Sequence, residues 1–260
     1  MESKIVLKTE NLSIGYTHQK VVNQVATAIH LSLESGKLIA MVGANGVGKS
    51  TLLRTLTAIQ NPLNGNIFLN GKNLNQYDAL DLAKEMSLVL TEKLPPSNLT
   101  VYELIALGRQ PYTNWIGKLS AEDKSKINDA IELTQTRALL EKKHYEISDG
   151  QLQIVLIARA LAQDTPLIVL DEPTTHLDLQ HKVALFKLLK KLTQETKKCV
   201  LFSTHDIDMA IQLSDEMIVM TDKKCQQDSP CNLIEMGIFN LLFEYKNISF
   251  DAQKGKFVIT

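Results

Sequence analysis

Short runs of apolar residues, separated by longer segments with helical spacing, dominate the pattern of this chain. Each run is bounded by polar or turn-forming residues and is too short for a helix, so each is expected to be a strand. The expected strands are 38–42, 87–90, 167–170, 200–202 and 217–220. Helical spacing predicts helices at 52–56, 180–192 and 206–213, and mostly helix over 101–162. Strands that alternate with helices predict an α/β fold with a mostly parallel central sheet.

The two ends of the chain follow other patterns. Residues 4–16 and 25–33 alternate loosely between apolar and polar positions, which predicts a half-exposed sheet. A short strand at 67–69 leads into a tight turn. We therefore expect an N-terminal antiparallel β subdomain. The pattern weakens in a C-terminal tail at about 221–260, where 257–259 is expected to form a last edge strand.

The long helical segment interrupts the alternation of strands and helices. A structureless loop of this length is uncommon inside one domain. We therefore expect an inserted α-helical subdomain at about 93–162, within a single domain of residues 1–260.

Charge balance, cysteine spacing and the length of apolar runs indicate which kinds of partner and environment suit this protein. Lys and Arg total 28 and Asp and Glu total 29, so no basic excess points to nucleic acid. Cys199, Cys225 and Cys231 lack metal-ligand spacing, which favours a reduced cytosolic protein. We expect no signal peptide, and no apolar run approaches the roughly 20 residues that cross a bilayer. The protein is expected to be soluble, or held at a membrane through a partner.

The expected strand 38–42 is followed by the pattern G-x-x-x-x-G-K-S at 43–50 and then by an expected helix. Strand, glycine-rich turn and helix N-terminus together form a phosphate cradle of backbone N–H groups. Lys49 supplies positive charge for the β- and γ-phosphates, and Ser50 offers a hydroxyl to Mg²⁺. An accidental lysine in a plain glycine turn is the alternative. The expected ATP-binding residues here are Gly43, Asn45, Gly46, Gly48, Lys49, Ser50 and Thr51.

Two carboxylates follow the expected strand 167–170. Ligands of open parallel sheets bind at the carboxyl ends of the strands. Asp171 can therefore hold Mg²⁺, directly or through water, and Glu172 is placed to polarise an attacking water. The alternative is that the pair merely caps a helix.

Five motifs in order carry a family resemblance: the phosphate loop, I-S-D-G-Q at 147–151, L-D-E-P-T at 170–174, T-H-L-D at 175–178 and S-T-H-D at 203–206. The chain resembles the ATP-binding subunits of ABC transporters along nearly its whole length, a P-loop NTPase fold. The resemblance implies a dimer of two copies with ATP sandwiched between them.

The resemblance also implies roles for single residues. Ser148 and Gly150, with Gln151 in the same motif, would complete the site whose γ-phosphate Lys49 of the other copy holds. Glu172 would be the general base or water-positioning group. The remaining roles are γ-phosphate contact for His205, organisation of the dimer interface for Asp178, and stacking on adenine for Tyr16.

Three of these residues have simpler interpretations. His205 could be a hydrogen-bonded histidine at a strand end, and Tyr16 an ordinary edge-strand tyrosine. Asp178 could be the N-cap of the helix that begins near residue 179 or 180, and this role can coexist with the interface role.

Two positions depart from the family pattern. Asp149 stands where a second glycine is usual, and we expect Gly150 to preserve the close backbone approach. Glu92 stands where a glutamine usually contacts Mg²⁺ and the water and links the site to the helical subdomain. We expect Glu92 to perform the glutamine's function with altered Mg²⁺ dependence.

The segment A-L-G-R-Q-P-Y at 106–112 is similar to ATPases that serve importers of iron–siderophore, haem and cobalamin. This resemblance implies membrane permease subunits, an indirect link to a substrate-binding protein, and a peripheral place at the cytoplasmic face of the inner membrane. The simpler interpretation is that the segment only packs the helical subdomain, with Arg109 a surface charge and Trp115 a buried or interfacial aromatic.

Two other functions stay open. A soluble ABC ATPase could act on nucleic acid or protein assembly, although the spacing of about a hundred residues between Lys49 and Ser148 leaves no room for a long coiled coil. A non-hydrolysing regulatory binder is disfavoured by the presence of Lys49, Asp171, Glu172 and His205.

Overall fold

A six-stranded sheet forms the centre of the computed structural model, which describes residues 4–18, 21–90, 94–95, 97–175, 177–222, 224–242 and 248–259. Its described strands, in spatial order, are β11 (Cys225–Asp228), β10 (Glu216–Met220), β4 (Leu38–Gly43), β9 (Cys199–Ser203), β8 (Leu167–Leu170) and β7 (Met86–Val89). All neighbours run parallel except β11, which is antiparallel to β10. The expected α/β fold with a mostly parallel sheet is confirmed.

The register of the parallel strands brings their carboxyl ends to one edge. Met41 of β4 lies opposite Ser203 of β9, and Leu170 of β8 lies opposite Phe202. The segments that follow β4, β8 and β9 therefore begin side by side. These segments carry the phosphate loop, the carboxylate pair and His205.

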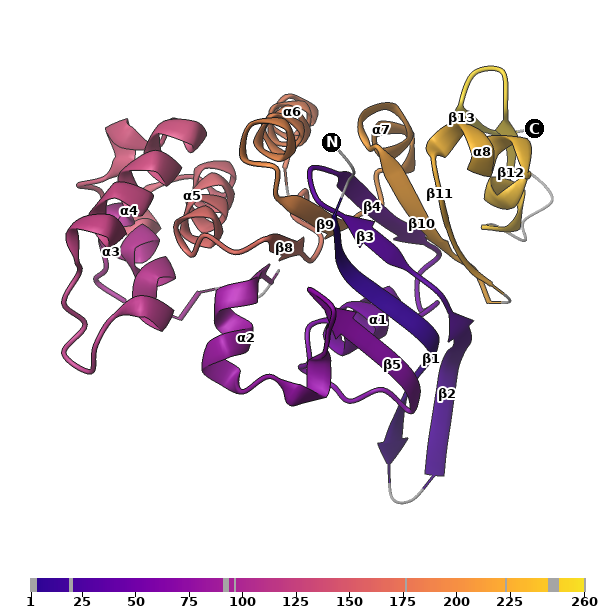
Figure 1. The fold of residues 1–260 in the computed structure, drawn as a ribbon. Coiled ribbons are helices and arrows are strands. Elements are labelled where there is room, and N and C mark those ends of the chain that lie inside the picture. Colours follow the sequence, from indigo (N-terminus) through magenta and orange to yellow (C-terminus); the bar gives the residue numbers. More distant parts are fainter. Residues whose placement is uncertain are drawn as a thin grey trace.

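A second, antiparallel sheet covers part of the first (Figure 1). It contains β1 (Ile5–His18), β2 (Val21–Ile29), β3 (Ser32–Glu34), β5 (Asn64–Leu69) and β6 (Lys72–Asn73). The expected strand at 25–33 is two strands, because the Thr9 hydroxyl donates to Ile29 O and accepts from the Leu31 N–H between them. A side chain thus satisfies the backbone where the ladder is broken.

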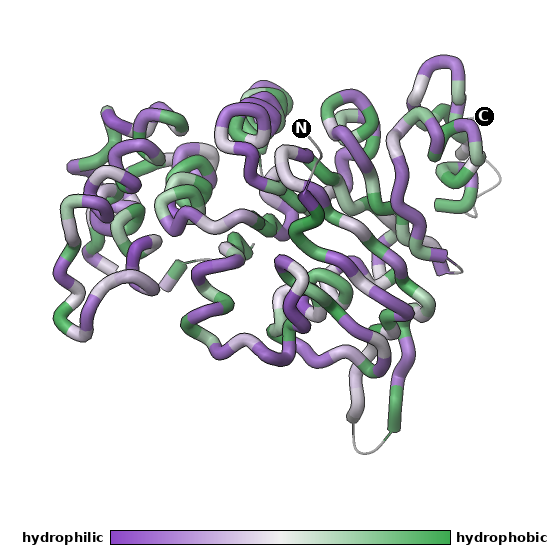
Figure 2. Tube along the Cα trace, viewed as in Figure 1, coloured by the Kyte–Doolittle hydropathy of each residue, from purple (hydrophilic) through white to green (hydrophobic). Residues whose placement is uncertain are grey.

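Helices pack on both faces of the central sheet. On one face α1 (Lys49–Leu56) shares a hydrophobic cluster with the antiparallel sheet. On the other face, α6 (Leu179–Thr196) and α7 (Ile207–Leu213) join the larger cluster. Alternate residues of β4 enter the two clusters, and Figure 2 shows the resulting concentration of hydrophobic segments in the middle of the molecule.

The segment where a helical insertion is expected contains α3 (Val101–Ala106), the 3₁₀ helices η2 (Leu107–Tyr112), η3 (Arg137–Leu139) and η4 (His144–Glu146), α4 (Ala121–Thr134) and α5 (Asp149–Ala162). Capping boxes begin α3, α4 and α5, at Thr100, Ser120 and Ser148. Each box satisfies two N-terminal backbone donors. Helix α4 ends at Thr134, because Gln135 adopts a left-handed conformation with φ of 56°.

The remaining elements were not all expected. The hydrophobic pattern did not predict η1 (Leu74–Gln76) or α2 (Ala79–Glu85), which precede β7. After β11 come α8 (Pro230–Glu235), η5 (Ile238–Leu241), β12 (Ile248–Asp251) and β13 (Lys256–Ile259). The edge strand expected at 257–259 pairs with β12 in a separate two-stranded sheet. No helix among the described residues is long and apolar enough to cross a membrane.

Candidate functional site

The loop between β4 and α1 has the backbone that a phosphate cradle needs. Gly46 and Gly48 have φ of 80° and 106°, in the left-handed region that glycine tolerates best. At Gly43 a Cβ atom would lie 2.6 Å from Met220 O, so only glycine fits beside β10. A Cβ atom on Gly46 would meet no atom within 4 Å, so open space lies over the loop.

Lys49 is a buried cation at the start of α1. Its ammonium donates to Gly43 O at 2.9 Å and to Ala44 O at 3.1 Å, and the residue is 7% exposed. Burial lowers the pKa of Lys49, while the negative charges of Glu172 and Asp171 oppose that shift. The two carboxylates and the ammonium therefore lie close enough to interact, as the expected site requires.

Ser203 joins the carboxylate pair to the neighbouring strand. Its hydroxyl donates to Asp171 Oδ1 at 2.7 Å and accepts from the Glu172 N–H at 2.8 Å. One side chain thereby fixes both the carboxylate of Asp171 and the backbone of Glu172. In the sequence Ser203 stands out only as the first residue of S-T-H-D, and its contacts follow from the pairing of β8 with β9.

Glu172 holds a strained backbone and an ordered side chain. Its φ is 45°, in a region that costs a non-glycine residue about 1–2 kcal/mol. Its carboxylate contacts His205 Nε2 at 2.7 Å and accepts from the Thr175 hydroxyl at 3.2 Å. Strain of this kind persists where the surroundings over-determine it, often at functional sites. Lys49, Asp171, Glu172 and His205 thus form one group.

The signature residues form a second group. The Ser148 hydroxyl accepts from the Gln151 N–H at 3.3 Å, and the Gln151 side chain accepts from the Ser148 N–H. A Cβ atom on Gly150 would lie 3.3 Å from the ring of His181. These contacts are with neighbouring residues of α5 and α6, whereas the polar contacts described for Ser148 include none with the phosphate loop.

Asp178 is the N-cap of α6, as expected. Its carboxylate accepts from the His181 N–H at 2.9 Å and contacts His181 Nδ1 at 2.7 Å. These hydrogen bonds lower the pKa of Asp178. The side chain is exposed, which leaves it accessible to a second copy.

Of two other expected site residues, the structure describes Tyr16 but not Glu92. Tyr16 lies on β1 opposite Asn23 and is 52% exposed, so its ring is accessible for stacking. Glu92 lies outside the described residues. Ser50 and Thr51, in the first turn of α1, are exposed and half-buried, and Asn45 is exposed on the loop.

Two details of the simpler interpretation of the segment at 106–112 are corrected, whereas packing within the helical segment and an interfacial place for Trp115 are not contradicted. Arg109 is not a surface charge: it is 3% exposed and its Nε donates to Asp123 at 2.8 Å. Trp115 is not buried, because 93% of it is exposed. The sequence could not place Arg109, since its partners are distant in the chain.

The donors present fit a magnesium ion. Mg²⁺ prefers oxygen ligands and usually takes one or two carboxylates with waters and substrate phosphates. Asp171, directly after β8, and Ser50, in the first turn of α1, offer a carboxylate and a hydroxyl of this kind. The described residues contain no cluster of three or more His, Cys, Asp or Glu that could hold a metal by themselves.

Comparisons with known proteins agree with this geometry. The family described as ABC transporter matches residues 26–175. An uncharacterized ABC transporter ATP-binding protein of Methanocaldococcus jannaschii is 40% identical over 97% of this chain and 86% of its own length. The iron(3+)-hydroxamate import ATP-binding protein of Bacillus subtilis is 39% identical over 82% of this chain and 78% of its own length.

A solved structure of an ABC transporter has a fold similar to that of this chain. An ABC transporter described as of metal-chelate type, in an inward-facing conformation, matches with a TM-score of 0.78 and 26% identity. The match covers 98% of this chain and 95% of that one. The chain therefore belongs to the ABC transporter family, as an ATP-binding subunit with ATPase activity.

Proposed function

We propose that this ABC ATPase drives an importer of an iron chelate of the siderophore type. The main support is the 39% identity to an iron(3+)-hydroxamate import protein over 82% of the chain. The segment at 106–112 supports an importer function by its similarity to ATPases of iron–siderophore, haem and cobalamin importers. The named iron(3+)-hydroxamate relative makes a siderophore the preferred cargo among the three that the resemblance implied.

The geometry of the site supports separate roles for its residues in binding the triphosphate, holding Mg²⁺ and activating water. The phosphate loop and Lys49 bind the triphosphate through backbone N–H groups and one buried positive charge. Asp171 and Ser50 would hold Mg²⁺, which supplies positive charge against the β- and γ-phosphates. Glu172 orients and polarises the attacking water, and the contact with His205 fixes its carboxylate at 2.7 Å.

A second copy of the chain completes the site. Ser148, Gly150 and Gln151 make their described polar contacts away from the phosphate loop of their own chain, so they are free to face the loop of another copy. Asp178 would lie at the interface between copies, and Tyr16 would stack on adenine. Glu92, at the usual glutamine position, would contact Mg²⁺ and the water.

The partners follow from this function. Two copies would bind two permease subunits at the cytoplasmic face of the inner membrane, and the permease would receive cargo from a substrate-binding protein. The ATPase need not touch the cargo, because the permease and binding protein would select it.

Purification of the protein with its native membrane partner tests the proposal. We expect a many-helix permease to co-purify, and we expect the siderophore-loaded binding protein to stimulate ATP hydrolysis. A soluble protein as the sole stable partner would contradict the importer function and favour a role in nucleic-acid or protein-assembly processes.

The role of Glu172 gives a sharper test. Glu172→Gln should bind ATP and dimerise, yet hydrolyse ATP about 10²- to 10⁴-fold more slowly, because a general base contributes on that scale. Phosphate release and gel filtration with ATP measure both effects. Glu10→Gln, which changes an exposed carboxylate paired with Lys8, is the control. Hydrolysis at the rate of the unmodified protein by Glu172→Gln would remove Glu172 from its assigned role.

A further inference from the structure

Helix α5 connects the signature residues to a turn packed against the central sheet. Ser148 caps its N-terminus, and residues 163–165 follow its C-terminus and lead into β8. The 14-residue helix is about 21 Å long. The same run of chain therefore joins Ser148 at one end to Asp171, just after β8, at the other.

Arg109 ties the C-terminus of α5 to the helical segment. Its Nη1 donates to Ala162 O at 2.9 Å, and its Nε donates to Asp123 of α4 at 2.8 Å. The guanidinium also lies 3.9 Å from the centre of the Tyr112 ring. A buried cation at a helix C-terminus satisfies orphan carbonyls and complements the helix dipole. These contacts of Arg109 join the end of α5 to α4 and η2.

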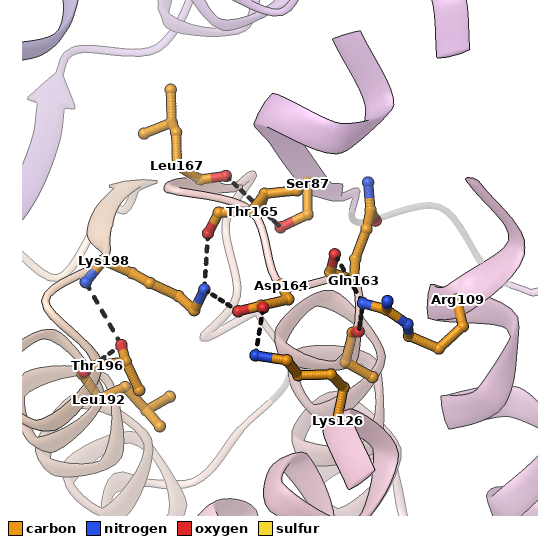
Figure 3. Close-up of polar contacts among 11 residues, drawn as sticks. Ser87, Arg109, Lys126, Gln163, Asp164, Thr165, Leu167, Leu192, Thr196 and Lys198 are labelled. Carbon is orange, nitrogen blue, oxygen red and sulfur yellow. Dashed lines mark hydrogen bonds and ion pairs between the residues drawn. The ribbon is translucent and has the colours of Figure 1, made fainter. Parts of the chain in front are cut away.

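Asp164 lies in the same turn and contacts both the helical segment and the central sheet (Figure 3). One carboxylate oxygen accepts from Lys126 of α4 at 2.7 Å. The other accepts from Lys198 at 2.6 Å, and Lys198 directly precedes β9 of the central sheet. Asp164 also adopts φ of 60°, a left-handed conformation that the surrounding contacts must hold.

Further hydrogen bonds fix the turn to the sheet. The Gln163 side chain donates to Met86 O at 3.1 Å, at the start of β7. Lys198 Nζ donates to Thr165 O at 3.0 Å, and the Thr165 hydroxyl donates to Ser87 Oγ at 3.1 Å. The turn is thus anchored on the sheet side, while Arg109 and Lys126 hold it from the helical side.

We propose that Asp164 is a positioning residue, whose carboxylate, shared between Lys126 and Lys198, sets the angle of α5 against the central sheet and so places Ser148 against the triphosphate held by a second copy. A rotation of α5 by about 10° around this turn would move Ser148 by about 4 Å. A misplacement of about 1 Å can reduce a reaction rate about 10²-fold. The inference rests on the proposed two-copy site.

Lys126→Gln tests the helical half of the shared contact, and it leaves the Lys198–Asp164 pair in place. We expect its kcat for ATP to fall about tenfold, while the Kd for a fluorescent ATP analogue changes less than about twofold. Asp164→Asn, which keeps the size and tolerates the left-handed backbone, should have the same effect. Lys190→Gln is the matched control, since the Lys190–Asp215 pair has a similar exposure of 29% and 28% but does not contact α5.

A distance measurement separates positioning from a loss of stability. Spin labels at Lys124→Cys on α4 and Lys187→Cys on α6, with Cys225 and Cys231 replaced by serine, report the angle between the helical segment and the sheet. We expect Lys126→Gln to broaden or shift the distance distribution by several ångströms, and Lys190→Gln to leave it unchanged.

The outcomes are distinct. An unchanged distribution in Lys126→Gln, or a fall in folded fraction with kcat per folded chain intact, would overturn the positioning role. Absence of ATP hydrolysis in the unmodified protein would instead contradict the proposed function, and the distance measurement would still decide whether Asp164 sets the angle.

Discussion

At the scale of single residues, the hydroxyl of Ser203 has more influence on the site than its place in the sequence suggested. It contacts Asp171 and the backbone of Glu172 at once. Removal of the Ser203 hydroxyl would leave the half-buried Asp171 carboxylate and Glu172 N–H without this hydrogen bond. The loss costs about 1–3 kcal/mol in the free energy of unfolding.

We therefore expect Ser203→Ala to lower both kcat and the free energy of unfolding, the latter by about 1–3 kcal/mol. Enzyme kinetics and urea unfolding measure the two effects. Ser214→Ala is the matched control, because the buried Ser214 hydroxyl has no hydrogen-bond partner among the described residues. Equal stability changes in the two variants would contradict the bridging role.

The buried ammonium of Lys49 gives a prediction for pH. Burial disfavours the charged form, so the pKa lies below the ordinary value of 10.5 and the charge is lost at a lower pH than for an exposed lysine. Affinity for ATP should therefore decline as the pH rises toward 10.5, at a lower pH than the charge of an exposed lysine would allow. Lys49→Arg keeps its charge over this range. The same decline in both proteins, measured as Kd, would show that Lys49 is not its cause.

At the scale of elements, the packing of η2 against α5 depends on a glycine that lets their backbones come close. A Cβ atom on Gly108 of η2 would lie 2.2 Å from Arg159 O of α5, so these two elements touch backbone to backbone. Arg109, the next residue, reaches the end of α5 only because of this approach.

Gly108→Ala should lower the free energy of unfolding by about 1–3 kcal/mol, the usual effect of overpacking. Urea unfolding followed by circular dichroism measures it. Gly117→Asn is the control, since Gly117 has φ of 75° with no atom within 4 Å of an added Cβ. A Gly108→Ala protein as stable as this control would contradict the close packing.

Elements with a strong local signal were predictable, and those set by distant partners were not. The apolar runs at 38–42 and 167–170 became fully buried strands. The break between β2 and β3 depends on Thr9, about twenty residues away in sequence, so the local pattern could not reveal it. For the same reason local motifs can propose roles for Lys49 and Asp171, whereas the contacts of Ser203 and Arg109 depend on the pairing of strands and helices.

At the scale of the whole molecule, the two groups of site residues imply that one chain is incomplete. The described hydrogen bonds of Ser148 are with Gln151 of α5, and none of them reaches the phosphate loop of the same chain. Association of two chains depends on concentration by mass action.

ATP hydrolysis per chain should therefore rise with protein concentration and reach a plateau when the dimer dominates. Initial rates over a dilution series, compared with the mass in solution by light scattering, test this expectation. A constant rate per chain at dilutions where only monomer is present would contradict the two-copy site.

Because Glu172 has a left-handed backbone, the residue that best suits the fold at this position differs from the residue that we propose for activity. Asparagine adopts a φ near 45° more readily than glutamate does, so it would relieve about 1 kcal/mol of strain and remove the carboxylate that contacts His205. A directed-evolution experiment that scored variants only by survival on heating would thus favour asparagine at this position. Such a screen would discard the residue that we propose to activate water, and laboratory stabilisation of this protein should therefore keep residue 172 fixed.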